Sequence, residues 1–142
     1  MTEQKQNVSL ASLLTPSKTV TVDYPTLNGF SVDLCYLARE ELIKLRSRCV
    51  SQKLNRKTRA FEETLDEDKF LTEYCKAVIK GWKGLKYKYL EELLLVDISG
   101  QEPEDDLSFS VENAETLMKN GADFDTWVTE VTGDLENFTK TK

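Results

Sequence analysis

One apolar stripe constrains the fold of this chain more than any other feature of the sequence. It follows Asp66, a good helix N-cap residue, with Glu67 and Asp68 at favourable positions in the first turn. At helical spacing the stripe contains Phe70, Leu71, Tyr74, Cys75, Val78, Ile79 and Trp82. Because so wide an apolar face must be covered on several sides, we expect this helix to be central, with Gly81 and Gly84 ending it.

A β-hairpin is predicted near the N-terminus. Residues 19–24 alternate polar and apolar side chains, and after Pro25 to Gly29 the alternation resumes from Phe30 to Tyr36. Two period-2 runs across a loop that contains Asn-Gly are typical of a hairpin. Since an isolated hairpin is marginal in water, its apolar face should rest on helices or pair with the edge of another chain.

The other segments mostly have helical patterns. We expect a helix from about Ala38 to Gln52, a short helix from Tyr87 to Leu94, a helix capped by Ser110 and ended by Gly121, and a last helix from about Asp123. In the helix capped by Ser110, the residues expected to point inward are Val111, Ala114, Leu117 and Met118. The apolar stripe of the last helix contains Phe124, Trp127, Val128, Val131, Leu135 and Phe138.

Two segments lack a clear period. Lys53 to Leu65 is expected to be a loop or a mobile bridge, and Val96 to Leu107 an acidic loop. The predicted fold class is therefore mainly α, formally α+β: a helical domain in which an N-terminal β-hairpin packs on about four to five helices. We expect a flexible arm over residues 1–15, a single globular domain over residues 16–138 and a frayed tail over residues 139–142.

Composition limits the chemistry of the chain. It has 142 residues, no histidine and three widely spaced cysteines, Cys35, Cys49 and Cys75. Zinc sites need closely spaced Cys or His, and the lack of histidine removes most general-base arrangements, so we expect core cysteines, no metal, no cofactor and no enzymatic activity. The stretch from Asp97 to Asp106 fails the calcium-loop pattern, since its sixth position is Glu102 and its twelfth is Ser108. No apolar run is long enough for a membrane span and no signal peptide is present, which predicts a cytoplasmic protein without a membrane partner.

The charge is unevenly placed. Residues 38–61 hold eight basic and two acidic residues, whereas residues 97–142 hold three basic and twelve acidic ones. Solvated helix faces are the simpler explanation, and complementarity between copies packed head to tail is the sharper one. The residues that we predict to bind a partner are Arg46, Arg56, Lys57, Arg59, Trp82, Tyr87 and Tyr89. The protein is acidic overall and has no helix-turn-helix or RNP-like pattern, so we expect these residues to contact protein rather than nucleic acid.

Three segments also carry a family resemblance: NGFSVDLCYLAREELIKLR (28–46), LNRKTRAFEETLDEDKF (54–70) and AVIKGWKGLKYKYLEELL (77–94). With FDTWVTEVTGDLENF (124–138), they resemble tail assembly chaperones of long-tailed bacteriophages in order and spacing. The resemblance implies a non-enzymatic protein that binds the tape measure protein, keeps it soluble and recruits tail tube subunits. It also implies self-association, a place in the host cytoplasm and absence from the finished virion.

In many members of that group a ribosomal frameshift adds a domain that meets the tube protein, which a protein sequence cannot show. Two other hypotheses stay open at this point. One is a different small phage adaptor, such as a head–tail connector, and the other is a nucleic-acid-binding regulator that uses residues 46–59.

Overall fold

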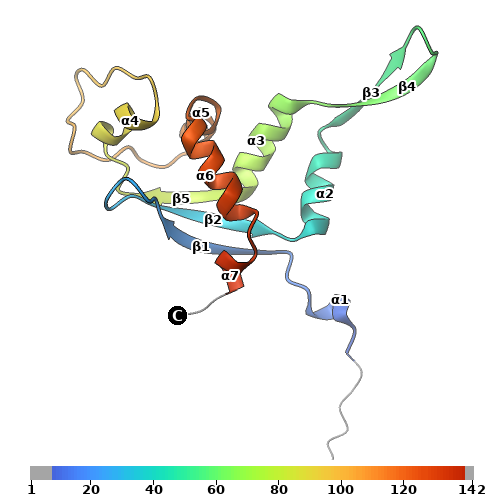
Figure 1. Ribbon diagram of the computed structural model, residues 1–142, viewed down its shortest axis with the longest axis horizontal. Coiled ribbons are helices and arrows are strands. Elements are labelled where there is room, and N and C mark those ends of the chain that lie inside the picture. The colour runs from blue at the N-terminus through green and yellow to red at the C-terminus, as the bar shows by residue number, and fades with distance from the viewer. Residues whose placement is uncertain (1–7, 140–142) are drawn as a thin grey trace, which may run out of the picture.

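The computed structural model describes residues 8–139, in which the chain forms seven helices and five strands. Strands β1 (Ser17–Asp23), β2 (Ser31–Leu37) and β5 (Ile79–Lys83) form an antiparallel sheet in the order β1-β2-β5 (Figure 1). The predicted α+β architecture with an N-terminal hairpin is confirmed. Residues 1–7 of the expected flexible N-terminal segment and residues 140–142 of the expected C-terminal tail lie outside the described range.

One face of the sheet is buried, and the other is largely polar. Helices α3 (Glu67–Val78), α5 (Val111–Asn120) and α6 (Ala122–Thr132) lie over the buried face, where Val32 and Leu34 have no exposed surface (Figure 1). On the other face the hydroxyl of Thr21 donates a hydrogen bond to Asp33, its cross-strand neighbour, at 2.5 Å. This division is the usual one for an antiparallel sheet that is covered on one side.

The remaining helices close the body at its ends. Helix α2 (Arg39–Ser47) follows β2, and α4 (Tyr87–Leu93) follows β5. Two helices have only four residues each, α1 (Leu10–Leu13) and α7 (Glu136–Thr139). Phe138 of α7 is buried against Tyr36 of β2, with ring centroids 5.3 Å apart, so this last turn belongs to the core, as the predicted stripe requires of Phe138.

The prediction that Lys53 to Leu65 forms a loop or a mobile bridge is wrong for most of this stretch. Strands β3 (Val50–Asn55) and β4 (Ala60–Leu65) pair in register as a separate two-stranded ribbon (Figure 1). The helix expected to reach Gln52 accordingly ends at Ser47. We call residues 50–65 the arm. Its strands are almost wholly exposed, so there was no buried face to give the sequence a clear period.

The predicted extension of α3 to Trp82 is also wrong. The helix ends at Val78, and Ile79 begins β5. Ile79 pairs with Leu34 and Trp82 pairs with Val32, so both lie on the core side, and Lys80 is the extra residue of a β-bulge. The bulge produces a three-residue spacing between two buried side chains of a strand. That spacing is the one that a helix gives, which is why the sequence pattern continued smoothly.

Two smaller expectations differ as well. Val111 and Leu135, both predicted to point inward, are exposed by about half of their surface. Val111 is the first residue of α5, beside the N-cap Ser110, whose hydroxyl accepts from the Asn113 backbone as predicted. Leu135 lies after α6 has ended at Thr132, so the stripe that begins in α6 no longer continues at helical spacing.

Candidate partner-binding surface

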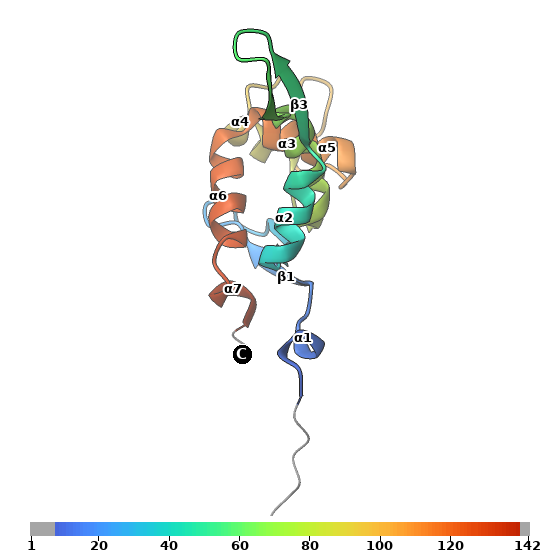
Figure 2. The same ribbon diagram turned by 90° about the vertical axis from the view of Figure 1, so that its right-hand side faces the viewer.

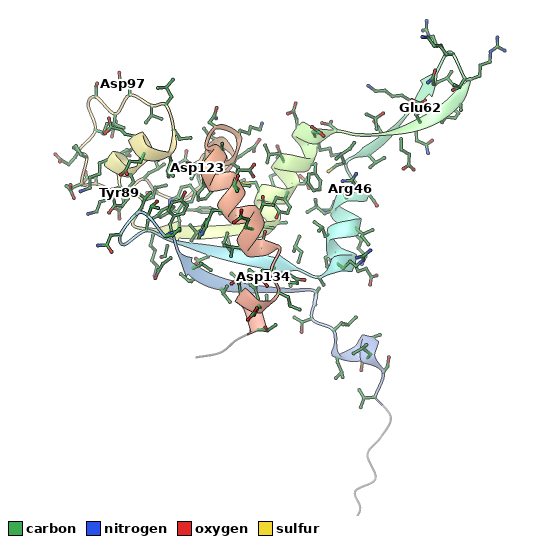
Figure 3. All side chains as sticks on the ribbon, in the orientation of Figure 1. Arg46, Glu62, Tyr89, Asp97, Asp123 and Asp134 are labelled. Atoms are coloured by element: carbon green, nitrogen blue, oxygen red, sulfur yellow. The ribbon has the colours of Figure 1, made fainter. Side chains whose placement is uncertain are left out.

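The structure does not bring the seven predicted partner-binding residues together. Arg46 lies near the end of α2, and Arg56, Lys57 and Arg59 form the tip of the arm. The other three belong to β5 and α4. Figure 3 shows Arg46 and Tyr89 on opposite sides of the body. The seven residues therefore do not form one site.

The aromatic residues of the second group have internal roles. Trp82 is only 8% exposed, and its indole N–H donates to the carbonyl of Leu107 at 2.9 Å. The hydroxyl of Tyr89 donates to the carbonyl of Asn28 at 2.6 Å, and Tyr87 is half-buried. These contacts join β5 and α4 to neighbouring loops. Trp82 is thus a core residue rather than a surface anchor, which corrects its place among the partner-binding residues.

The lysines of this segment also have internal partners. Lys86 and Lys88 reach the two carboxylate oxygens of Glu104 at 3.1 and 2.7 Å. Hydrogen bonds from Lys88 and Lys86 hold the pKa of Glu104 below its ordinary value, and the bond to Glu104 raises the pKa of Lys86. All three groups are solvent-exposed, so the pairs contribute little free energy and mainly position the acidic loop against α4.

The arm projects from the body with its side chains in solvent. Leu54 and Phe61 are cross-strand partners near the tip, and they are 56% and 70% exposed. At its base the backbone N–H of Asp66 donates to the carbonyl of Cys49 at 2.8 Å, which holds the two ends of the arm together. Figure 2 shows α1, α2 and β3 along the same side of the molecule.

A groove of about 630 Å³ lies where α2, α3, α6 and the base of the arm meet. Its volume falls within the range of ordinary binding pockets. Five of its lining residues are apolar or aromatic, three are carboxylates, and the last is a threonine. They are Leu42, Leu65, Phe70, Leu71, Tyr74, Glu67, Asp68, Asp125 and Thr129. We call it the acidic-rimmed groove. Burial, with a smaller effect of Asp125, raises the pKa of the Tyr74 hydroxyl.

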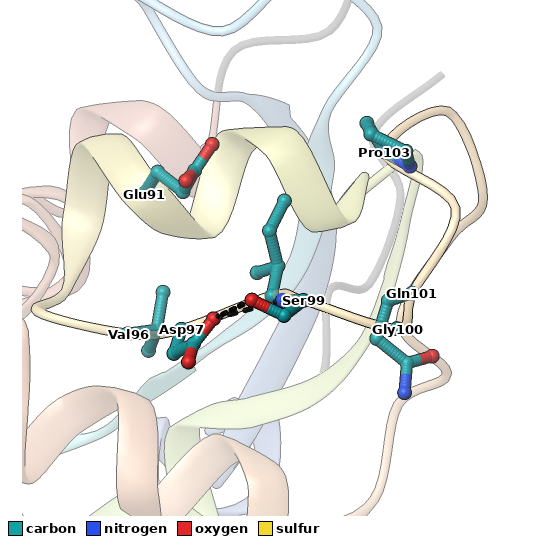
Figure 4. Close-up of a pocket in the computed structure, with 8 residues that line it drawn as sticks. Glu91, Val96, Asp97, Ser99, Gly100, Gln101 and Pro103 are labelled. Carbon is teal, nitrogen blue, oxygen red and sulfur yellow. Dashed lines mark hydrogen bonds between the residues drawn. The ribbon is translucent and has the colours of Figure 1, made fainter.

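A second hollow of about 410 Å³ lies under the loop after α4 and is drawn in Figure 4. Asp97 accepts hydrogen bonds there from both the backbone N–H and the hydroxyl of Ser99, and these lower the pKa of Asp97. Its carboxylate shapes the turn of its own loop. Within residues 8–139, no group of three or more Cys, Asp or Glu side chains is arranged to hold a metal ion.

All three cysteines are buried and unpaired, as expected for core residues. Burial, with a smaller contribution from Glu115, raises the pKa of the Cys75 thiol to about 11. A thiol held protonated in this way is a poor nucleophile. None of the helices described over residues 8–139 is long and apolar enough to cross a membrane.

Comparison with known families identifies the group to which the chain belongs. Residues 39–142, which run from the start of α2 to the last residue, match the family of YdaY prophage proteins. This chain is a member of the YdaY prophage protein family. The matched region includes the arm, the acidic-rimmed groove and all seven predicted partner-binding residues, and it begins after the β1–β2 hairpin. No curated protein and no solved structure matches the chain.

Proposed function

We propose that this YdaY family protein is a non-enzymatic tail assembly chaperone that binds the tape measure protein of its prophage and keeps it soluble. Membership of a prophage family supports the phage setting, and the segment resemblance supports the tail role. In this proposal the protein works in the host cytoplasm, is absent from the mature virion and helps to recruit tail tube subunits, either itself or through a longer frameshifted form.

One observation carries the proposal. Of the twelve large apolar side chains that are exposed within residues 8–139, eight lie on the segment around α1, on α2 and on the arm. These elements line one side of the molecule (Figure 2). Single exposed apolar residues are normal, but their concentration on one side is typical of a surface that binds another protein.

The surface suits a helical client. Leu10, Leu13 and Leu14 follow helical spacing in and beside α1, and Ile43 is half-exposed on α2, near Arg46. An amphipathic helix could lay its apolar stripe along such a surface, and several weak contacts of this kind give avidity while still permitting release. Release matters because a chaperone of this class has to leave before the tube closes around its client.

Co-expression with the tape measure protein encoded in the same prophage tests the proposal. We expect the tape measure protein to stay soluble and to co-purify with the wild-type chain. The variant Ile43→Asp should weaken co-purification, whereas Leu95→Asp, the same change at a fully exposed leucine in the loop after α4, should not. Equal solubility of the tape measure protein with and without the chaperone would refute the role.

A head–tail connector is the second candidate, and the same exposed apolar side chains could serve it. Mass spectrometry of purified virions separates the two functions. A connector would be found at constant copy number in the particle, whereas a chaperone should be absent. A third candidate, nucleic-acid binding, draws on the cationic tip of the arm, and a gel shift at low salt that depends on Arg56 and Lys57 would favour it.

A further inference from the structure

The arm carries an apolar contact pair that its own chain leaves in solvent. Leu54 faces Phe61 across the ribbon, and the two lie on the same face as Val50 and Leu65 at the base. Val50 and Leu65 are half-buried by the body, but Leu54 and Phe61 are mostly exposed. A two-stranded ribbon is marginally stable in water by itself, so covering this pair would stabilise the arm.

The tip beyond this pair is cationic and already ordered. The Asn55 side chain accepts from the backbone N–H of Lys57 at 2.9 Å, and the Arg59 N–H donates to the Asn55 carbonyl at 2.6 Å. No ion pair among residues 8–139 involves Arg56, Lys57 or Arg59. The tip therefore presents three positive charges on a backbone turn that is already formed, so binding does not have to order that turn.

The acidic-rimmed groove offers the complementary chemistry. Phe70 and Tyr74 stack at 5.8 Å in its wall, and the carboxylates of Glu67, Asp68 and Asp125 lie among its lining residues. No Lys or Arg is among those residues. A groove with an apolar floor and an acidic rim is complementary to a protein segment that carries an apolar pair behind a basic tip.

The arm cannot enter the groove of its own chain. Leu65 both ends β4 and lines the groove, and Asp66 then caps α3, so the arm starts at the edge of the groove and points away from it (Figure 1). A second copy of the chain can supply an arm from outside. The segment around α1 is a weaker occupant, because Val8 to Ser17 has exposed leucines but no basic residue.

We propose that the arm of one copy inserts Leu54 and Phe61 into the acidic-rimmed groove of a second copy, with its basic tip against the acidic rim. Because the two contacting surfaces differ, only the first and last copies of an open assembly are left with an unused groove or arm. Such a contact closes into a reciprocal dimer or a larger ring where the geometry permits, and otherwise extends as an open filament. This inference does not depend on the identity of the client.

A mixing experiment tests the contact directly. The arm variant Leu54→Ser/Phe61→Ser keeps an intact groove, and the groove variant Asp68→Lys/Asp125→Lys keeps an intact arm. Sedimentation velocity on the full chain should show wild-type assemblies that dissociate in high salt, and at least about tenfold weaker self-association for each variant alone. An equimolar mixture of the two variants should form a heterodimer and nothing larger.

Several outcomes would overturn the proposal. The first two are a monomeric wild type and assembly that survives in either variant. The third is a mixture that fails to form the heterodimer although both variants keep the far-UV spectrum and melting temperature of the wild type. The matched control is Leu10→Ser/Leu13→Ser, which should assemble like the wild type. Loss of assembly in that control would assign the groove to the N-terminal segment instead. A groove variant that does not fold is replaced by Glu67→Lys alone, to which the same criteria apply.

Discussion

The contact between Gly84 and Gly29 gives a prediction with a built-in control. Both glycines have left-handed backbone angles, with φ of +73° and +83°. A Cβ added at Gly84 would lie 2.0 Å from the carbonyl oxygen of Gly29, whereas a Cβ added at Gly29 would have no atom within 4 Å. Alanine therefore meets the same backbone penalty at both positions but a steric overlap at only one of them.

The expected magnitudes follow from these two terms. A left-handed alanine costs about 1–2 kcal/mol, which should be the whole effect of Gly29→Ala. Gly84→Ala adds an overpacking cost of about 1–3 kcal/mol, because the obstacle is backbone that can move only if two loops separate. The total of about 2–5 kcal/mol is a large fraction of the roughly 5–15 kcal/mol by which a small domain is stable.

Urea unfolding of the wild type and the two variants measures these differences. The midpoint should fall for both variants and much further for Gly84→Ala, with the slope m unchanged if only stability is affected. If the free energies of unfolding of the two variants agree within about 0.5 kcal/mol, then the close approach of the two loops does not exist in solution and the reasoning fails.

Three further predictions concern other parts of the molecule. Tyr89→Phe removes the donor to the Asn28 carbonyl and should lower the free energy of unfolding by about 1 kcal/mol in the same urea assay. The pKa of Glu104 is lowered in the folded state, so its ion pairs contribute to stability above the ordinary value of 4.5 and this contribution is lost as the pH falls through the lowered value. Because the pairs are exposed, the melting temperatures of the wild type and Glu104→Gln should differ only slightly at pH 7 and converge at low pH. With all three thiols buried and the pKa of Cys75 raised to about 11, a thiol reagent at pH 8 should react rapidly only after denaturant is added, and fast labelling of the folded chain would contradict the buried positions.

The elements with one buried face could be predicted from the sequence. The hairpin alternation around Val32 and Leu34, the N-caps Asp66 and Ser110, and the start of α4 at Tyr87 are all present in the structure. In each of these elements a local signal and the buried pattern agree. An element can be predicted from the sequence when its local signals and its pattern of buried residues agree.

The arm and the end of α3 were missed for opposite reasons. The arm buries almost nothing, so its main signals were the Asn55 turn and the apolar residues Val50 and Leu54 on one face of β3. At the end of α3 the signal was strong but ambiguous, since the bulge at Lys80 gives a strand the spacing of a helix. The acidic-rimmed groove could not be predicted from the sequence, because it combines residues of α2, α3, α6 and β4 that only the tertiary structure brings together.

The hydrogen bond that closes the base of the arm has a consequence for how the chain folds. The sheet forms only when β5 reaches β2, and the intervening chain contains α2, the arm and α3. Once Cys49 and Asp66 are joined, the arm no longer lengthens the loop that must close, and even before that each doubling of loop length costs only about 0.6 kcal/mol. Residues can therefore be added or removed at the tip with little effect on assembly of the sheet. The reach of the arm can vary independently of the body that carries it.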